Sequence, residues 1–421
     1  MKPVQILLLT IGLFVVAQFS SAQTWTQTSA PSTNSWFSIA SSADGSKLVA
    51  VSPGGGIYSG GIYISSNSGL TWTQTSAPFN YWGSVASSAD GNKLVAVSDN
   101  EFGGSPGQIY VSTNSGANWA PTSAPSNNWV SVASSADGNK LVAVTFDSPP
   151  SGRIYTSTNS GTTWTQQTNA PNKSWSSVAC SADGSKLVVQ NGFDFGSIYK
   201  STNSGVTWLQ AGNLPFQGWG EISGMQVIAS SADGCRLVAA FRGSENNIPV
   251  PICISTNSGT TWVATSSPSN YWACVASSAD GSKLAAAAWN NSSVNSSPGP
   301  IYTSTDSGTT WVSNNVPSQP WSSIAYSADG GRLVAAAGWG PVGPIYTSQS
   351  ILRPSLNLAP SSGNLTLSWT VPSTNFVVQQ SSDLQNWTNS IITPTLNLTN
   401  LQEQVILPPT NGSGFYRLKT P

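Results

Sequence analysis

Short apolar runs separated by turn residues repeat along most of this chain. One unit begins at a tryptophan and reads "WGSVASSADGNKLVAV" from Trp82. Similar units begin at Trp36, Trp129, Trp175, Trp219, Trp272 and Trp321, and the copy at Trp219 carries a short insertion. The seven starts are 44 to 53 residues apart, a spacing typical of one propeller blade per unit.

Within each unit the pattern predicts four short strands. "W-x-x-V-A-S" is the first, and "SADG" follows as a turn in which Asp caps the loop and Gly allows positive φ. The continuous apolar run "KLVAV" predicts a second strand that is buried on both faces. "IYTS" is the third strand, and "TWTQTSAP" is a fourth that ends at proline.

The last unit lacks its fourth strand, and the chain carries that strand at its other end. The seventh unit stops at "IYTSQS" (Ile345–Ser350), whereas "QTWTQTSAP" (Gln23–Pro31) precedes the first full unit. A ring closed by a strand from the chain start would remove exposed sheet edges. We therefore expect an all-β fold, a seven-bladed β-propeller over residues 23–350 closed by the N-terminal strand, rather than a linear solenoid with separate capping repeats.

The turn before each fourth strand carries a recurring motif, "STNSGTTW" at Ser157–Trp164. It resembles the Asp-box, S-x-D-x-G-x-T-W, of bacterial neuraminidase repeats in the sialidase- and sortilin-like propellers. Five copies have Asn in the Asp position and only Asp306 keeps the acid, which suits a side chain that bonds its own turn. The resemblance implies a structural turn away from any active site. The copies are Ser65–Trp72, Ser112–Trp119, Ser157–Trp164, Ser201–Trp208, Ser255–Trp262 and Ser304–Trp311.

Composition narrows the range of partners. Charged residues are 7% of the chain, against about 25% in ordinary soluble proteins. The net charge of -1 offers no electrostatic footprint for nucleic acid or an anionic membrane. The chain has no histidine and its four cysteines lack metal-ligand spacing, so we expect no metal and no cofactor. A monomer is expected.

The chain begins with a segment that has the features of a secretory leader. Lys2, the apolar run Ile6–Val16 and the small residues before Ala22 predict a signal peptide over residues 1–22, cleaved after Ala22. No segment is long enough to span a bilayer as a helix. The sequence therefore predicts a secreted or cell-surface protein.

Residues 351–421 differ from the repeats. Their alternating segments, such as "NFVVQQSSDLQNWT", predict a small β-sandwich domain. With the terminal "FYRLK" this tail resembles C-terminal modules on exported proteins of Verrucomicrobia-type bacteria. That resemblance implies a surface or secretion accessory, with an independent carbohydrate-binding role as the alternative.

Export would permit disulfides, and the four cysteines allow three pairings. They are Cys180, Cys235, Cys253 and Cys274. The other interpretation is that each fills a repeat position as a small buried side chain, and the sequence does not decide between the two.

Candidate ligand contacts lie in the loops between second and third strands. The fourteen charges of the "SADG" turns and of the base three residues later, such as Asp137 and Lys140, are expected to be solvated turn charges. Most other propeller charges, with several aromatic residues, fall in the variable loops, where function concentrates on a rigid scaffold. The candidate residues are Asp99, Glu101, Phe102, Asp147, Arg153, Phe193, Asp194, Arg242, Glu245, Trp289 and Trp339.

Three function classes remain. We expect a non-catalytic exported propeller that presents its variable loop face to an extracellular protein or glycan, with no catalytic residues. The alternative is a secreted carbohydrate-active enzyme or a lectin. A typical sialidase is excluded because it needs an arginine triad, and within the propeller only Arg153 and Arg242 lie outside repeat positions. Other acid pairs could be drawn from Asp99, Glu101, Asp147 and Asp194, but no spacing favours one.

The third class follows from a resemblance to photosystem assembly factors, which depend on a basic patch that this chain lacks.

Overall fold

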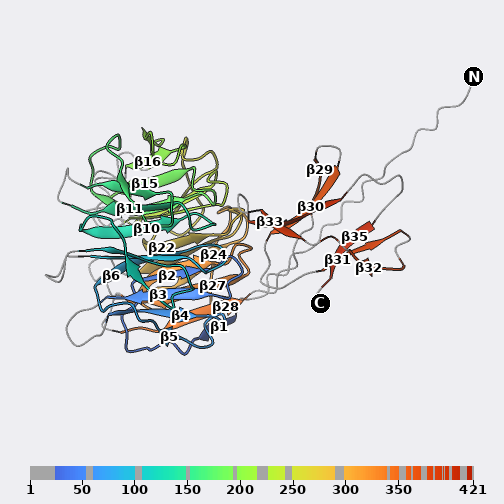
Figure 1. Ribbon diagram of the computed structural model, residues 1–421, viewed down its shortest axis with the longest axis horizontal. Coiled ribbons are helices and arrows are strands. Elements are labelled where there is room, and N and C mark those ends of the chain that lie inside the picture. The colour runs from blue at the N-terminus through green and yellow to red at the C-terminus, as the bar shows by residue number, and fades with distance from the viewer. Residues whose placement is uncertain are drawn as a thin grey trace, which may run out of the picture.

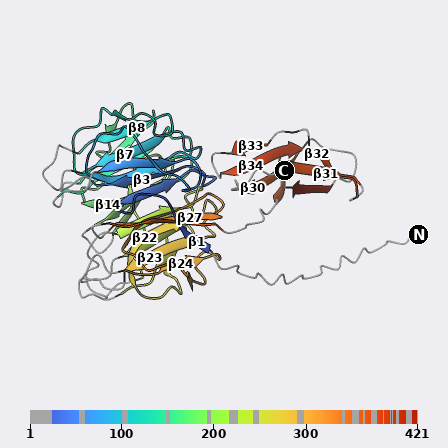
Figure 2. The same cartoon turned by 90° about the horizontal axis from the view of Figure 1, so that it is seen from below.

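Seven four-stranded antiparallel sheets form the main body of the computed structural model (Figures 1 and 2). The first strands of neighbouring sheets contact one another in a closed circuit, from β2 to β26 and back to β2. The predicted seven-bladed propeller is therefore confirmed. The structure describes residues 24–53, 60–99, 107–147, 152–192, 197–215, 226–241, 249–289, 298–338, 342–349, 357–361, 364–370, 377–382, 385–390, 392, 394–397, 401–407 and 415–419. The expected leader, residues 1–22, lies outside them.

Each blade runs outward from the axis in chain order. The first strands are β2 (Ser38–Ser41), β6 (Trp82–Ser87), β10 (Trp129–Ser134), β14 (Trp175–Cys180), β18 (Gln226–Ser230), β22 (Tyr271–Ser277) and β26 (Trp321–Tyr326). The second strands are β3 (Leu48–Ser52), β7 (Leu94–Ser98), β11 (Leu141–Thr145), β15 (Leu187–Asn191), β19 (Leu237–Phe241), β23 (Leu284–Trp289) and β27 (Arg332–Ala337).

The outer strands complete the blades. The third strands are β4 (Gly61–Ser65), β8 (Ile109–Ser112), β12 (Ile154–Ser157), β16 (Ile198–Ser201), β20 (Cys253–Ser255), β24 (Ile301–Ser304) and β28 (Ile345–Gln349). The fourth are β5 (Thr73–Gln74), β9 (Ala120–Pro121), β13 (Thr165–Gln166), β17 (Leu209–Gln210), β21 (Val263–Ala264), β25 (Val312–Ser313) and, in the seventh blade, β1 (Thr24–Gln27).

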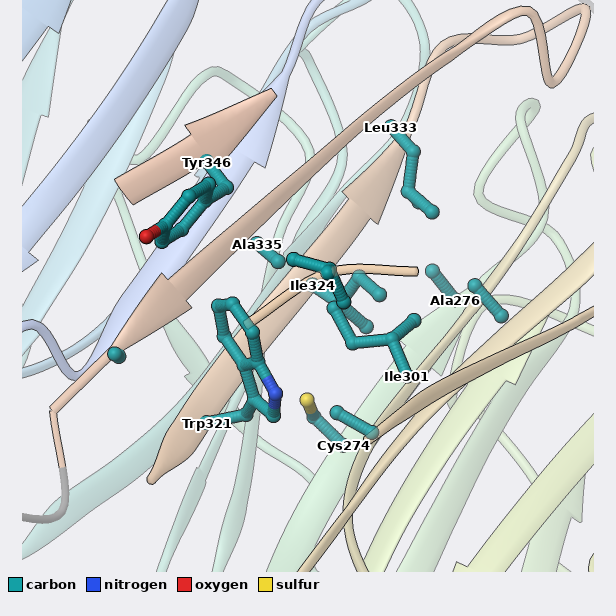
Figure 3. Close-up of a cluster of buried hydrophobic side chains, with 12 residues drawn as sticks. Cys274, Ala276, Ile301, Trp321, Ile324, Leu333, Ala335 and Tyr346 are labelled. Atoms are coloured by element: carbon teal, nitrogen blue, oxygen red, sulfur yellow. The ribbon is translucent and has the colours of Figure 1, made fainter. Parts of the chain in front are cut away.

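The N-terminal strand closes the ring as predicted. β1 pairs antiparallel with β28, so that Trp25 lies opposite Ser348 and Gln27 opposite Tyr346. Trp25 also packs against the buried cluster between the sixth and seventh blades, which contains Cys274 and Trp321 (Figure 3). The seventh blade therefore holds both ends of the propeller chain.

The hydrophobic core lies between blades rather than within them. Each second strand is buried along its apolar run, as "KLVAV" predicts, and contributes to clusters shared by adjacent blades. In six blades the opening tryptophan also meets the tyrosine of the third strand edge to face, with ring centroids 5.1 to 5.9 Å apart, a favourable aromatic geometry. The fifth blade has Cys253 in the tyrosine position.

The Asp-box is a self-bonded turn, as the resemblance implies. In the first copy the Asn67 side-chain oxygen accepts hydrogen bonds from the Ser65 hydroxyl and from the Thr71 amide at 3.0 and 2.8 Å. Both Ser68 and Gly69 have positive φ, so two consecutive residues, not the glycine alone, are left-handed. The bonds stay within the motif, which supports a structural role.

The charges of the "SADG" turns were expected to be solvated turn charges. The structure corrects this expectation, because the bases contact the turn of the next blade. The Lys93 ammonium donates to the Asn139 side-chain oxygen of the next blade at 2.6 Å. A Cβ added to Gly138 would lie 2.7 Å from Lys93 Cβ, so the lysine stem lies directly on the neighbouring turn. The equivalent base lies on the equivalent glycine at all seven blade junctions, including Arg332 on Gly45. The bases therefore connect blades.

All four cysteines are free thiols. Cys253 and Cys274 are buried, while Cys180 and Cys235 are partly exposed. The interpretation that each fills a repeat position as a small buried side chain therefore holds for Cys253 and Cys274, whereas Cys180 and Cys235 are not fully buried. Cys274, for example, aligns with Ser38 and Ser84, which follow the opening tryptophan by two residues.

The C-terminal segment forms two small sheets. One contains β29 (Asn357–Ser361), β30 (Asn364–Thr370), β34 (Gln402–Leu407) and β33 (Thr395–Asn397) in that order. The other contains β32 (Thr388–Asn389), β31 (Val377–Ser381) and β35 (Phe415–Lys419). A buried cluster around Trp369 and Val378 includes residues of both sheets. We call residues 357–419 the C-terminal module.

Candidate binding face

The antiparallel order of each blade sorts its connections onto two faces. The "SADG" turns and the Asp-box turns lie on one face, here called the turn face. The connections between second and third strands lie on the other, together with the segments that link one blade to the next. We call this second surface the loop face. All the predicted ligand residues belong to these connections or to the strand ends beside them.

Four of the predicted residues are described by the structure, and they differ in exposure. Arg153 is exposed, Asp147 is half-buried and Asp99 is 8% exposed. Trp289 is 1% exposed, ends β23, and donates its indole N–H to the Trp321 carbonyl at 3.2 Å. Trp289 thus belongs to the core between two blades and does not offer its ring to a ligand. The other predicted residues lie outside the described part: Glu101, Phe102, Phe193, Asp194, Arg242, Glu245 and Trp339.

Asp147 and Asp99 are both hydrogen-bonded to neighbouring residues. The Thr145 hydroxyl donates to the Asp147 carboxylate at 3.0 Å, and the Ser174 hydroxyl donates to the Asp147 carbonyl oxygen. The Asp99 amide donates to the Tyr81 carbonyl at 2.9 Å, which ties the loop to the start of the first strand. These hydrogen bonds hold the first residues of the loops against the rigid blades.

Aromatic side chains bridge neighbouring blades on the loop face. Phe37 of the first blade and Tyr81 of the second meet edge to face, with centroids 5.9 Å apart. Phe146 of the third blade lies over Gly192 of the fourth, where an added Cβ would be 2.8 Å from its ring. The loop face therefore carries apolar rings that are set by contacts across blade junctions.

Sequence reasoning missed two aromatic residues of the loop face, Phe37 and Phe79. Phe37 follows the opening tryptophan directly, and Phe79 lies in the segment that links the first blade to the second. Phe79 is 70% exposed, the second most exposed large apolar side chain in the described chain after Leu70. A comparison of the linking segments would have found it, because "PFNYW" has Phe where the next blade has Ser126.

The described residues of the loop face provide groups that can bind a ligand. No group of three or more His, Cys, Asp or Glu side chains within the described ranges could hold a metal ion. The exposed cation Arg153, the half-buried Asp147 and the rings of Phe79 and Tyr81 can contact a ligand by charge, hydrogen bonding and stacking. In the described part of the chain, no helix is long and apolar enough to cross a membrane.

Comparisons with known proteins identify the fold. No family model matches the chain, and no curated protein matches it. Among solved structures, YCF48 from Cyanidioschyzon merolae is 16% identical with a TM-score of 0.56, over 78% of this chain and 99% of that one. YCF48 bound to D1 peptide is 16% identical with a TM-score of 0.54, over 79% and 98%.

An enzyme shares the same architecture. The GH74 xyloglucanase from Xanthomonas campestris is 14% identical with a TM-score of 0.56, over 83% of this chain but only 59% of the xyloglucanase. The similarity to a peptide-binding protein and to a hydrolase shows a common propeller fold, and fold alone does not specify function.

Proposed function

We propose that this protein is a non-catalytic exported propeller that binds an extracellular protein or glycan on its loop face. The observation that carries the proposal is the exposed Phe79, two residues before Tyr81 of the Phe37–Tyr81 pair that bridges the first and second blades. A largely uncharged aromatic surface suits stacking on a sugar ring or contact with an apolar side chain. The solved complex of YCF48 bound to D1 peptide supports it, since a propeller of similar fold binds a peptide partner.

The second candidate is a carbohydrate-active enzyme, favoured by the fold shared with the GH74 xyloglucanase. Such an enzyme needs two carboxyl groups, one as acid and one as base or nucleophile. Asp147 and Asp99 are the described acids of the loop face, and Asp99 is buried. This candidate therefore depends on acids outside the described residues, namely Glu101, Asp194 and Glu245.

The test combines a glycan array with pull-down of partners by the secreted full-length protein. Phe79→Ser and Arg153→Ala should weaken binding of the ligand found at least tenfold. Leu70→Ser is the matched control, because Leu70 is equally exposed and apolar but lies on the turn face. Binding unchanged by Phe79→Ser and Arg153→Ala, or weakened only by Leu70→Ser, would refute the loop-face proposal. Release of sugars from a polysaccharide would favour the enzyme instead.

A further inference from the structure

The turn face has an axial cavity of about 170 Å³. The alanines of the seven "SADG" turns form an apolar cluster around it, in which six are 7 to 9% exposed. Their main-chain groups are already used, because each alanine N–H donates to the carbonyl of the alanine in the next turn at 2.7 or 2.8 Å. Serines also line the cavity, but their hydroxyls donate within the turns, for example from Ser42 to the Asp44 carboxylate and from Ser87 to the Ser88 carbonyl. The alanine ring itself therefore offers methyl groups. The alanines are Ala43, Ala89, Ala136, Ala182, Ala232, Ala279 and Ala328.

A residue of the C-terminal module lies in this cavity. Leu401 is in the turn between β33 and β34, packs against the alanine cluster and lines the cavity. Figures 1 and 2 show the module beyond one end of the propeller, with β33 and β34 toward it. Leu401 is thus the described residue that joins the two parts of the chain through an apolar contact.

The backbone of Leu401 is unusual. Its φ is 53°, in the left-handed region, and it is the one positive-φ residue described outside the propeller. A leucine there is disfavoured because its Cβ lies too close to the following carbonyl oxygen, so the conformation persists where surrounding contacts favour it. Packing of the side chain against the alanine ring is such a contact.

We propose that the axial ring of the turn face is a docking site for an apolar side chain at the tip of a hairpin, and that its occupant is Leu401 of the same chain. The ring disfavours a charged tip because its main-chain groups bond one another and the hydroxyls of the serines beside them donate within the turns, as Ser42 does to Asp44. It accepts a single branched aliphatic side chain along the axis. Docking holds the C-terminal module over the turn face and leaves the loop face as the open end of the propeller.

The experiment uses the full-length protein and small-angle X-ray scattering. Leu401→Asp should release the module and shift the radius of gyration and the maximum dimension to larger values. Ile406→Asp is the matched control: Ile406 is 57% exposed on β34 of the same sheet and does not line the cavity. It should leave the scattering profile unchanged.

A change on the propeller side separates docking from damage to the module. Ala89→Glu places a charge in the ring and leaves the module intact, so it should produce the same expansion. Hydrogen exchange of β30 and β34 verifies that the module stays folded in each variant. Compact profiles for both Leu401→Asp and Ala89→Glu, or equal expansion in Ile406→Asp with the module folded, would overturn the proposal. If Leu401→Asp unfolds the module, Ala89→Glu alone decides.

Discussion

The Ala328 amide donates to the Ala43 carbonyl oxygen at 2.7 Å and so joins the last blade to the first. A second connection lies further out, where the Thr28 amide donates to the Ile345 carbonyl at 2.9 Å beside the β1–β28 pairing. The ring is therefore closed at its inner rim by main-chain atoms and at its outer edge by the N-terminal strand.

Deleting residues 1–30 should destabilise the propeller strongly. It would expose the edge of β28 and remove Trp25 from the cluster around Trp321, with a cost of about 2–3 kcal/mol from the lost apolar burial alone. Scanning calorimetry should show a lower Tm, and size-exclusion chromatography should show association through the open edge. Deletion of residues 1–22 is the control and should leave both unchanged. An equal Tm for the two deletions would contradict the closure.

Gly138→Ala should destabilise the protein by about 1–2 kcal/mol or more. Gly138 has a φ of 66°, which an L residue adopts only at that order of cost, and the new methyl would collide with Lys93. Urea unfolding measures the change. Gly83→Ala is the control, because its nearest neighbour would be a carbonyl oxygen at 3.7 Å. Equal midpoints for the two variants would show that the turn does not require glycine.

Much of this architecture could be predicted from repetition alone. The positions of Trp25 and Tyr346 in the repeat identify the displaced strand, because the seventh unit lacks the segment that the start of the propeller carries. The role of Lys93 could not be read in this way. Its spacing gives a position in the turn, but which neighbour it contacts depends on the curvature of the ring.

Stability should fall at acidic pH. Burial raises the pKa of Asp280, but hydrogen bonds from Ser278 and Ser282 outweigh it and leave the pKa below its ordinary value. Five other turns show the same direction: Asp44, Asp90, Asp137, Asp183 and Asp233. The folded form then binds protons more weakly than the unfolded form, whose aspartates titrate near about pH 3.9.

The resulting stabilisation is complete above that value and is lost as the pH falls through the folded pKa values. We expect a flat Tm from about pH 8 to 5 and a decline below about pH 4. Thermal unfolding monitored by circular dichroism across this range is the measurement. Asp280→Asn should make the acid decline shallower. A Tm that stays constant or rises below pH 4 would rule out these turns as the source.

Alkylation should distinguish one thiol from the other three. Burial raises the pKa of Cys180 and of Cys274 to about 12, and it raises that of Cys253 as well, so these thiols stay protonated at pH 8. Cys235 lies in a turn of the fifth blade with its sulfur near the Lys186 ammonium at 3.1 Å. Iodoacetamide at pH 8 should label Cys235 first, and all four in urea, as read by mass spectrometry.

Cys235→Ser matches the residue at this turn position in the neighbouring blades, Ser185 and Ser282, and should abolish the fast labelling. Rapid labelling of Cys253 or Cys274 in the native protein would contradict the burial of these two thiols. Fewer than four labelled thiols in urea without reductant would reveal a disulfide and contradict the free state of the cysteines.

The candidate site was less predictable than the fold. Arg153 is exposed as a loop charge should be, but Trp289 is buried because its strand extends further than the apolar run suggested. Variable loops have no second copy for comparison, so their side chains cannot be placed from the pattern. The contact of Leu401 with the alanine ring has no local signature at all, since it joins parts of the chain that share no motif.

The hydrogen bonds of the alanine ring join only main-chain groups, so they are the same at every junction between blades. The chain could therefore begin at any junction between blades without breaking this circle of hydrogen bonds. A circular permutant of the propeller would join Gln349 to Thr24 through a linker and would begin and end between Gln166 and Trp175. Its termini would then lie between the third and fourth blades, and the same seven-bladed ring should assemble.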